Sequence, residues 1–126
     1  MKTLLYIAVG SGLGGGLRYG LDLLARCIGM GGFPFSTLFI NLSGSLLIGY
    51  LAGLSAMGSK KTVHPQKWHF WVTGFCGGYT TFSAFNWQVL ELIQAGKGTL
   101  AGAYAAGSIG LGLIAVSMGF TQGKLT

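Results

Sequence analysis

The chain has 126 residues, of which 51% are hydrophobic and only 8% are charged, and its mean hydropathy is +0.61. Soluble domains usually carry about 25% charged residues, so we predict an integral membrane protein. Its only acidic residues are Asp22 and Glu91, which argues against catalysis by paired carboxylates and against multi-carboxylate metal sites. The net charge of +6 comes from scattered cations rather than from one basic element, which argues against nucleic-acid binding.

The first predicted membrane span covers residues 4–25, which is long enough for a bilayer core that needs about 20 residues. Lys2 precedes it as in a signal peptide, but no small-x-small cleavage site follows, so we expect a retained helix. Gly12, Gly16 and Gly20 recur every four residues. This spacing predicts a face of small residues on which another helix can pack closely in lipid.

Arg18 and Asp22 are the charged residues inside this span, and their four-residue spacing places them on one helical face. They could form a neutralising ion pair near the membrane boundary, with Arg18 extending towards the headgroups. Alternatively, Arg18 could place a cation at the mouth of an anion pathway. The spacing leaves both interpretations open.

The second predicted span covers residues 35–57, and its one strongly polar residue is Asn41, close to Ser43 and Ser45. An asparagine inside an apolar helix most often bonds to a neighbouring helix. Alternatively, its amide could line a pore and offer N–H donors to an anion. A polar stretch, 58–67, follows, and we expect its His64 and the nearby His69 to be solvated rather than metal ligands.

The third predicted span covers residues 68–94 and contains Gly74, Gly77 and Gly78, which predict a break because glycine destabilises a helix. In lipid, such a break survives where it is packed in protein or lines a watery cavity. Carbonyl groups at a broken helix favour a cation, and N–H groups favour an anion. Phe82 and Phe85 follow on one helical face, where they could pack or turn positive ring edges towards a lumen.

The fourth predicted span covers residues 99–120 and has a second face of small residues at Gly102, Ala106 and Gly110. Four spans place both termini on one side of the membrane. The cations expected on that side are Lys2, Lys60, Lys61, Lys67 and Lys124, against Arg26 and Lys97 on the other. This bias predicts cytoplasmic termini. Since four spans make a small bundle for a pore, we expect a homodimer, in which carbonyls from both breaks could hold a central ion.

The sequence Gly74-Phe75-Cys76-Gly77-Gly78, followed by Thr80-Thr81-Phe82-Ser83-x-Phe85, resembles the CrcB/Fluc family of fluoride channels. Two further matches support this, Arg18-Tyr19 after the first glycines and Thr37-Leu38-x-x-Asn41-Leu42-x-Gly44. The resemblance covers almost the whole chain. It implies an all-α membrane protein with one transmembrane domain, residues 1–126, and not an enzyme. It also implies an antiparallel, dual-topology homodimer in the bacterial plasma (inner) membrane, with two pores along the subunit interface.

The resemblance also implies roles for individual residues. The fluoride pore would be lined by Asn41, Phe82, Phe85, Ser83, Tyr104 and Ser108. Arg18 would lie near the vestibule, and the backbone carbonyls of Gly77 and Thr80 from both chains would hold a structural sodium ion at the dimer axis. Transport would be passive export of fluoride, which enters cells as neutral HF from acidic surroundings and is trapped as the anion.

The chain departs from the family pattern at three positions. Ala84 stands where the family usually has Thr, Gln88 where Glu is frequent, and Gly112 where a hydroxyl is common.

The alternative to a fluoride channel is a small four-span, dimeric, proton-coupled exporter of cations or drugs, which would need a carboxylate deep in the membrane. Asp22 and Glu91 both lie near predicted span ends, which disfavours this alternative.

Overall fold

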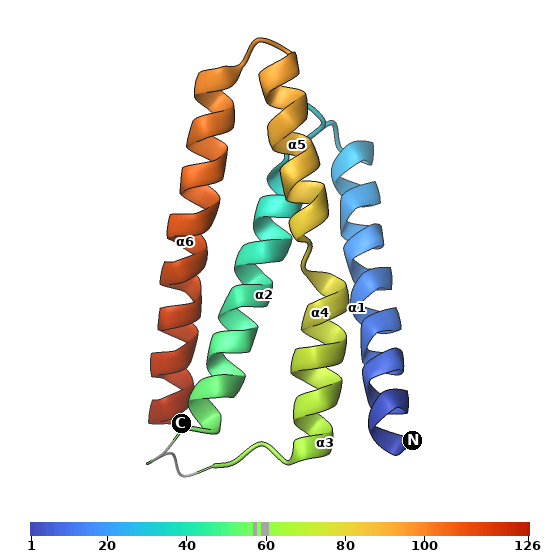
Figure 1. Ribbon diagram of the computed structural model, residues 1–126, viewed down its shortest axis with the longest axis vertical. Coiled ribbons are helices and arrows are strands. Elements are labelled where there is room, and N and C mark those ends of the chain that lie inside the picture. Colours follow the sequence, from blue (N-terminus) through green and yellow to red (C-terminus); the bar gives the residue numbers. More distant parts are fainter. Residues whose placement is uncertain (57, 59–60) are drawn as a thin grey trace.

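The computed structural model describes residues 1–56, 58 and 61–126, and all of its regular elements within those ranges are helices. The prediction of an all-α chain is therefore confirmed for the described part of the chain. The helices run roughly side by side, and both termini lie at the same end of the molecule (Figure 1). Met57, the predicted end of the second span, and Lys60, one of the counted cations, lie outside the described residues.

Helices α1 (Lys2–Cys27) and α2 (Phe35–Leu54) form the first half of the chain. They are joined by a short connection in which Gly29 has a φ of +82°, a conformation that other residues rarely adopt. Pro34 stands immediately before α2, where its fixed φ and missing N–H do not disturb the helix. The predicted span 4–25 lies within α1, and α2 begins at the predicted residue.

The third predicted span corresponds to four consecutive elements. Helix α3 (Pro65–Trp68), the π-helical segment η1 (His69–Cys76) and helix α4 (Gly77–Tyr79) follow one another directly, and α5 (Phe82–Gln94) begins after two extended residues, Thr80 and Thr81. The glycines predicted to break the helix are themselves helical. The interruption lies two residues further on, at Thr80–Thr81.

Close backbone contacts explain why two of these glycines, Gly74 and Gly78, remain helical. Gly74 and Gly78 lie against the backbone of α1, so that a Cβ atom at either position would collide with it. Gly10 and Gly14 make the matching approach from α1. Packing of the two backbones therefore compensates for the low helix propensity of glycine. The face of α1 that packs within the chain is not the predicted one, because Gly12, Gly16 and Gly20 have no neighbour within 4 Å.

Helix α6 (Gly98–Leu125) packs against α2 in the same way. Gly49 of α2 lies on the backbone of α6, and Gly119 of α6 lies on the backbone of α2. The predicted small face of α6 is not used for this contact, since Gly102 and Gly110 have no neighbour within 4 Å. Two glycine-mediated helix pairs, α1 with η1–α4 and α2 with α6, therefore form the body of the chain.

Helix α5 belongs to the second pair. It packs on α6 around a small cluster of buried side chains, Leu92, Ala101 and Tyr104, which partly buried Phe85 and Val89 of α5 extend. The chain thus leaves α1 at Thr80–Thr81 and crosses to α6 (Figure 1). The interruption is the place where the third predicted span changes its packing partner.

The surface of the molecule is apolar over much of its length. Helices α2 and α6 are long and apolar enough to cross a membrane, each with a mean hydropathy of 1.6 over its most apolar 18 residues. In α6, only 11% of that 18-residue stretch is buried, and Ile109, Leu113 and Met118 are each more than 60% exposed. The core helix of a soluble protein would be mostly buried, so lipid or another chain must cover this surface.

Candidate functional site

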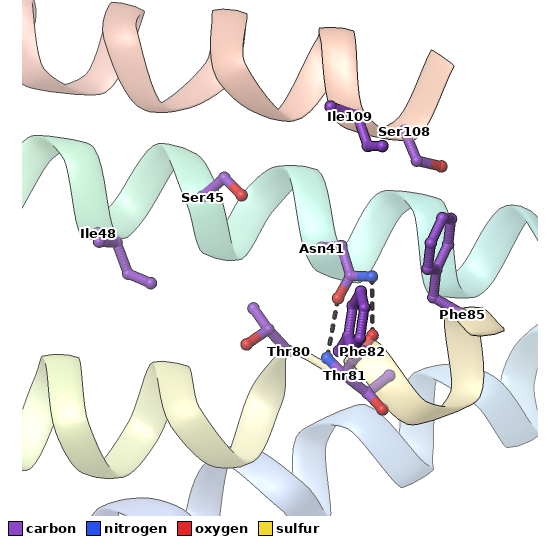
Figure 2. Close-up of a pocket in the computed structure, with 9 residues that line it drawn as sticks. All are labelled: Asn41, Ser45, Ile48, Thr80, Thr81, Phe82, Phe85, Ser108 and Ile109. Atoms are coloured by element: carbon purple, nitrogen blue, oxygen red, sulfur yellow. Dashed lines mark hydrogen bonds between the residues drawn. The ribbon is translucent and has the colours of Figure 1, made fainter. Parts of the chain in front are cut away.

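A pocket of about 300 Å³ opens beside the interruption (Figure 2). Its walls come from α2, from the extended residues, from the first turn of α5 and from the middle of α6. The lining residues are Asn41, Ser45, Ile48, Thr80, Thr81, Phe82, Phe85, Ser108 and Ile109. Four of the six predicted pore residues, Asn41, Phe82, Phe85 and Ser108, are therefore brought together.

The amide of Asn41 holds the backbone of the interruption. Its Nδ2 donates to the Thr81 carbonyl oxygen at 3.0 Å, and its Oδ1 accepts from the Thr81 N–H at 2.9 Å (Figure 2). An uninterrupted helix would direct that N–H to the carbonyl of Gly77. Asn41 thus satisfies two backbone groups that the interruption leaves without helical partners, and one N–H of its amide remains for the pocket.

Two phenylalanines form the apolar wall. The ring centroids of Phe82 and Phe85 are 6.1 Å apart with an interplanar angle of 30°. Phe85 also packs on Tyr104, at a centroid distance of 5.2 Å, whereas Phe82 is 76% exposed. The pocket wall is consequently packed against the protein at Phe85 and open to the surroundings at Phe82.

Ser108 contributes to this pocket a buried hydroxyl that lacks a partner. Its Oγ is buried and has no hydrogen bond among the described residues. The two threonine hydroxyls of the pocket already have partners. Thr80 Oγ1 donates to the Cys76 carbonyl at 2.8 Å, and Thr81 Oγ1 accepts from the Ala84 N–H at 3.2 Å. A buried hydroxyl without a partner is costly, so the Ser108 hydroxyl is a candidate group to bond a water molecule or a solute.

The two remaining predicted pore residues lie outside the pocket lining. Ser83 is exposed, and its hydroxyl shares a hydrogen bond of 3.3 Å with that of Thr81. Tyr104 is 3% exposed, and its hydroxyl donates to Gln88 Oε1 at 2.9 Å. Tyr104 therefore supports the wall from behind, through its contact with Phe85.

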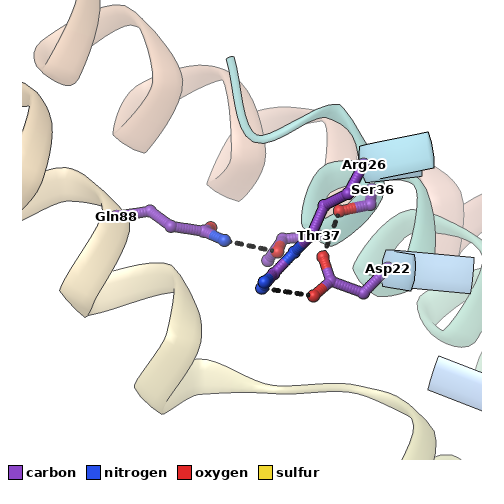
Figure 3. A network of polar contacts seen from close by, with 5 residues as sticks. All are labelled: Asp22, Arg26, Ser36, Thr37 and Gln88. Carbon is purple, nitrogen blue, oxygen red and sulfur yellow. Dashed lines mark hydrogen bonds and ion pairs between the residues drawn. The ribbon is translucent and has the colours of Figure 1, made fainter. Parts of the chain in front are cut away.

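Gln88 joins three helices through one side chain. Besides accepting from Tyr104 of α6, it donates through Nε2 to Thr37 Oγ1 of α2 at 2.8 Å (Figure 3). Thr37 is 4% exposed, so both hydroxyls depend on this amide. In the sequence, Gln88 was identified only as a departure from the family pattern. The signal that identified Asn41, an amide inside an apolar span, applies to Gln88 equally.

Of the two interpretations left open for Arg18 and Asp22, the ion pair between them is not formed. Asp22 forms its ion pair with Arg26, at 2.9 Å, and not with Arg18. Its other oxygen accepts from the Ser36 hydroxyl at 2.9 Å, which connects α1 to α2 (Figure 3). Arg18 instead donates through Nε to the Gly78 carbonyl at 3.2 Å. Its guanidinium thus lies at the C-terminal end of α4, where a cation is favoured.

Gly77 and Thr80, the predicted carbonyl ligands of a cation, stand at the two ends of α4, Gly77 as its first residue and Thr80 directly after its last. Gly77 is exposed, and Thr80 has extended backbone with a ψ of 158°. Among the described residues, no three His, Cys, Asp or Glu side chains group as metal ligands do. The groups near α4 that could hold a cation are therefore oxygens of the backbone and of neutral side chains.

Some lining residues have little or no signal in the sequence. Ser45 is one helical turn beyond Asn41, so it could have been placed on the same face. Ile48 and Ile109 are ordinary apolar residues of membrane helices, and nothing distinguishes them from the isoleucines that face lipid.

The pocket is aromatic and polar, lies between apolar helices and is of a size for a small solute, which fits a membrane protein that binds or passes such a solute. The chain belongs to the family of the CrcB-like protein, Camphor Resistance (CrcB), whose model matches residues 5–120. The resemblance found in the sequence is thereby confirmed.

Several relatives are similar over nearly their full length, and each is named "Fluoride-specific ion channel FluC". The protein of Paramagnetospirillum magneticum is 42% identical over 120 residues, which are 94% of this chain and 93% of the relative. That of Flavobacterium psychrophilum is 40% identical, with 98% of each chain covered. That of Thermus thermophilus is 41% identical, with 98% of this chain and 96% of the relative covered. The names describe channels, which agrees with the expectation that the chain is not an enzyme.

Proposed function

We propose that this protein is a fluoride-selective channel that exports fluoride passively and relieves its toxicity. The observation that carries this proposal is the unpartnered Ser108 hydroxyl in a pocket walled by Phe82 and Phe85. A hydroxyl donor can replace part of the hydration of a small anion. The edges of the aromatic rings add weak positive potential without a fixed charge that would hold the anion too tightly.

Selectivity for fluoride also rests on the relatives, which are named as fluoride-specific channels. The pocket chemistry is compatible with those names. Ser108 and the free N–H of Asn41 supply hydrogen-bond donors, and small hard anions gain most from such donors because they are the most strongly hydrated. The residues that line the pocket bear no charge, so selection must come from hydrogen bonds and shape.

We propose that two copies of the chain form an antiparallel, dual-topology homodimer with two pores. The pocket is open on the side of Phe82, and a second chain could close it. The small-residue faces at Gly12, Gly16 and Gly20 and at Gly102 and Gly110 have no neighbour within the chain. Such faces allow helices to approach closely in lipid, so they are the surfaces on which we expect the second copy.

A structural sodium ion at the dimer axis fits the carbonyl groups of this chain. Backbone oxygens are hard, neutral ligands that suit a hard cation. Because Asn41 takes the Thr81 N–H, the Gly77 carbonyl is freed from its helical partner, and the carbonyl of Thr80 lies in extended backbone. Two carbonyls are too few for a cation, so the second chain would supply the others. The ion would stabilise the dimer rather than take part in conduction.

We place the protein in the plasma membrane of a bacterium, the inner membrane where there are two, as a multi-pass protein. The relatives come from bacteria, and α2 and α6 are apolar and exposed. The alternative function, a proton-coupled cation exporter, lacks support. Asp22 is neutralised by Arg26 near the end of α1, and Glu91 is exposed near the end of α5.

The test is fluoride efflux from proteoliposomes that contain the purified protein, measured with an ion-selective electrode beside chloride efflux. The proposal expects fast fluoride release and little chloride release. Absence of fluoride flux, or equal flux of both anions, would refute it. Transport of a cationic dye driven by a proton gradient would instead favour the exporter.

A further inference from the structure

Helix α3 and the start of α1 lie at the end of the molecule that carries both chain termini (Figure 1). A second pocket lies between them. It has a volume of about 530 Å³ and lies between the first turns of α1 and the start of η1. Its lining residues are Tyr6, His64, Gln66, Lys67, Phe70 and Trp71. We propose that this pocket binds the headgroup phosphate of an anionic phospholipid.

The distribution of charge favours an anion from outside the chain. Lys67 lines the pocket, and the only two side-chain carboxylates of the chain, Asp22 and Glu91, lie near the C-terminal ends of α1 and α5, at the opposite end of the molecule. At that opposite end, Lys97 shares a pocket with both carboxylates. Lys67 has no such neighbour in its own pocket, so an anionic ligand would complement it.

The other lining groups match a phosphate. The His64 Nδ1 accepts from the Gln66 N–H at 3.3 Å, which leaves the Nε2–H of the neutral ring as a donor. The Tyr6 hydroxyl and the Gln66 amide add further donors. Phosphate oxygens accept such bonds, and a lysine ammonium adds a charge-assisted one.

The aromatic rings favour a lipid over free phosphate. Tyr6 is 39% and Trp71 is 41% exposed, and amphipathic rings of this kind are enriched at the depth of the lipid headgroups. Trp71 is held by edge-on contacts with Phe70 and Phe75, at centroid distances of 5.1 and 5.4 Å. These rings offer apolar surface to a glycerol backbone and upper acyl chain, which inorganic phosphate lacks.

The experiment is native mass spectrometry of the full-length protein in detergent, titrated with phosphatidylglycerol or with phosphatidylcholine. We expect preferential retention of phosphatidylglycerol. Lys67→Gln should lower that retention about fivefold, the effect of one cation near an anionic surface, and Lys67→Arg should preserve it. The matched control Lys97→Gln removes one charge at the opposite end and should leave retention unchanged.

Two outcomes would overturn the proposal. One is an equal loss in Lys67→Gln and Lys97→Gln, which would indicate a general charge effect. The other is displacement of phosphatidylglycerol by millimolar inorganic phosphate, which would indicate a phosphate site without lipid specificity. Lipid retention is measured in the absence of fluoride, so the result does not depend on the proposed channel function.

Discussion

Replacing Asn41 by aspartate separates the two roles that its amide has in the structure. The aspartate can still accept a hydrogen bond from the Thr81 N–H, which Asn41 Oδ1 accepts at 2.9 Å. It can no longer donate to the Thr81 carbonyl, which Asn41 Nδ2 contacts at 3.0 Å. It also places a negative charge in the lining of the pocket.

The two consequences differ in size. Leaving one backbone carbonyl without a donor costs about 1–3 kcal/mol of stability. Repulsion between a carboxylate and an anion about 4 Å away is about 4 kcal/mol at an effective dielectric constant of 20. Since 1.4 kcal/mol is a factor of ten, fluoride flux in Asn41→Asp should fall roughly a thousandfold, far more than the loss of stability alone would suggest.

Asn41→Ala is the matched control because it removes both hydrogen bonds and adds no charge. Two backbone groups then lose their partners, at a cost of about 2–6 kcal/mol. Stability in detergent, measured by thermal unfolding, should therefore fall from wild type through aspartate to alanine. Fluoride efflux from proteoliposomes should instead fall from wild type through alanine to aspartate. If both measurements give the same order, Asn41 acts only through the fold and the assigned role in the pore is wrong.

Three further changes test the wall, the amide network and the helix contact. Phe82→Ile should reduce fluoride efflux at least tenfold (on the order of 1.4 kcal/mol) because the aromatic edge is lost, while size-exclusion chromatography should still show the dimer. Gln88→Leu should lower the unfolding temperature, since two buried hydroxyls lose their partner at about 1–3 kcal/mol each, whereas Gln88→Glu should be tolerated. Gly119→Ala should destabilise the protein through a clash with the α2 backbone, and Gly98→Ala, where no atom lies within 4 Å, should not.

The sequence predicts the elements and the polar residues of the candidate site better than it predicts their partners. Asn41 stands out because it is an amide in an apolar span. Its partner, Thr81, does not stand out, because which backbone groups lack a helical partner depends on where the helix ends. Glycine propensity predicted the break at Gly74, Gly77 and Gly78. Contact with the α1 backbone keeps Gly78 helical, and the stop falls at Thr80 and Thr81.

Repeated spacings explain the other differences. In α1, glycines occur at several overlapping four-residue registers, so periodicity alone cannot distinguish Gly10 and Gly14, which touch η1 and α4, from Gly12 and Gly16, which touch nothing in the chain. Asp22 is likewise four residues from both Arg18 and Arg26. Asp22 pairs with Arg26 because Arg18 donates to the Gly78 carbonyl instead. That contact joins residues 60 positions apart in the sequence, so local spacing does not reveal it.

The position of the pocket is set by contacts on both sides of the interruption. On one side, Gly78 fixes the end of α4 to α1, and Gly44 of α2 leaves room for the methyl group of Thr80. On the other side, Thr81 caps α5 and is held by Asn41. Because these contacts come from α1 and α2 independently, the two extended residues cannot move without breaking one of them. A fixed interruption also fixes Asn41, so in the proposed channel the remaining N–H of its amide is in place before an ion arrives and the ion does not have to reorganise the site. For a strongly hydrated anion, that pre-organisation is what makes the exchange of water for protein donors favourable.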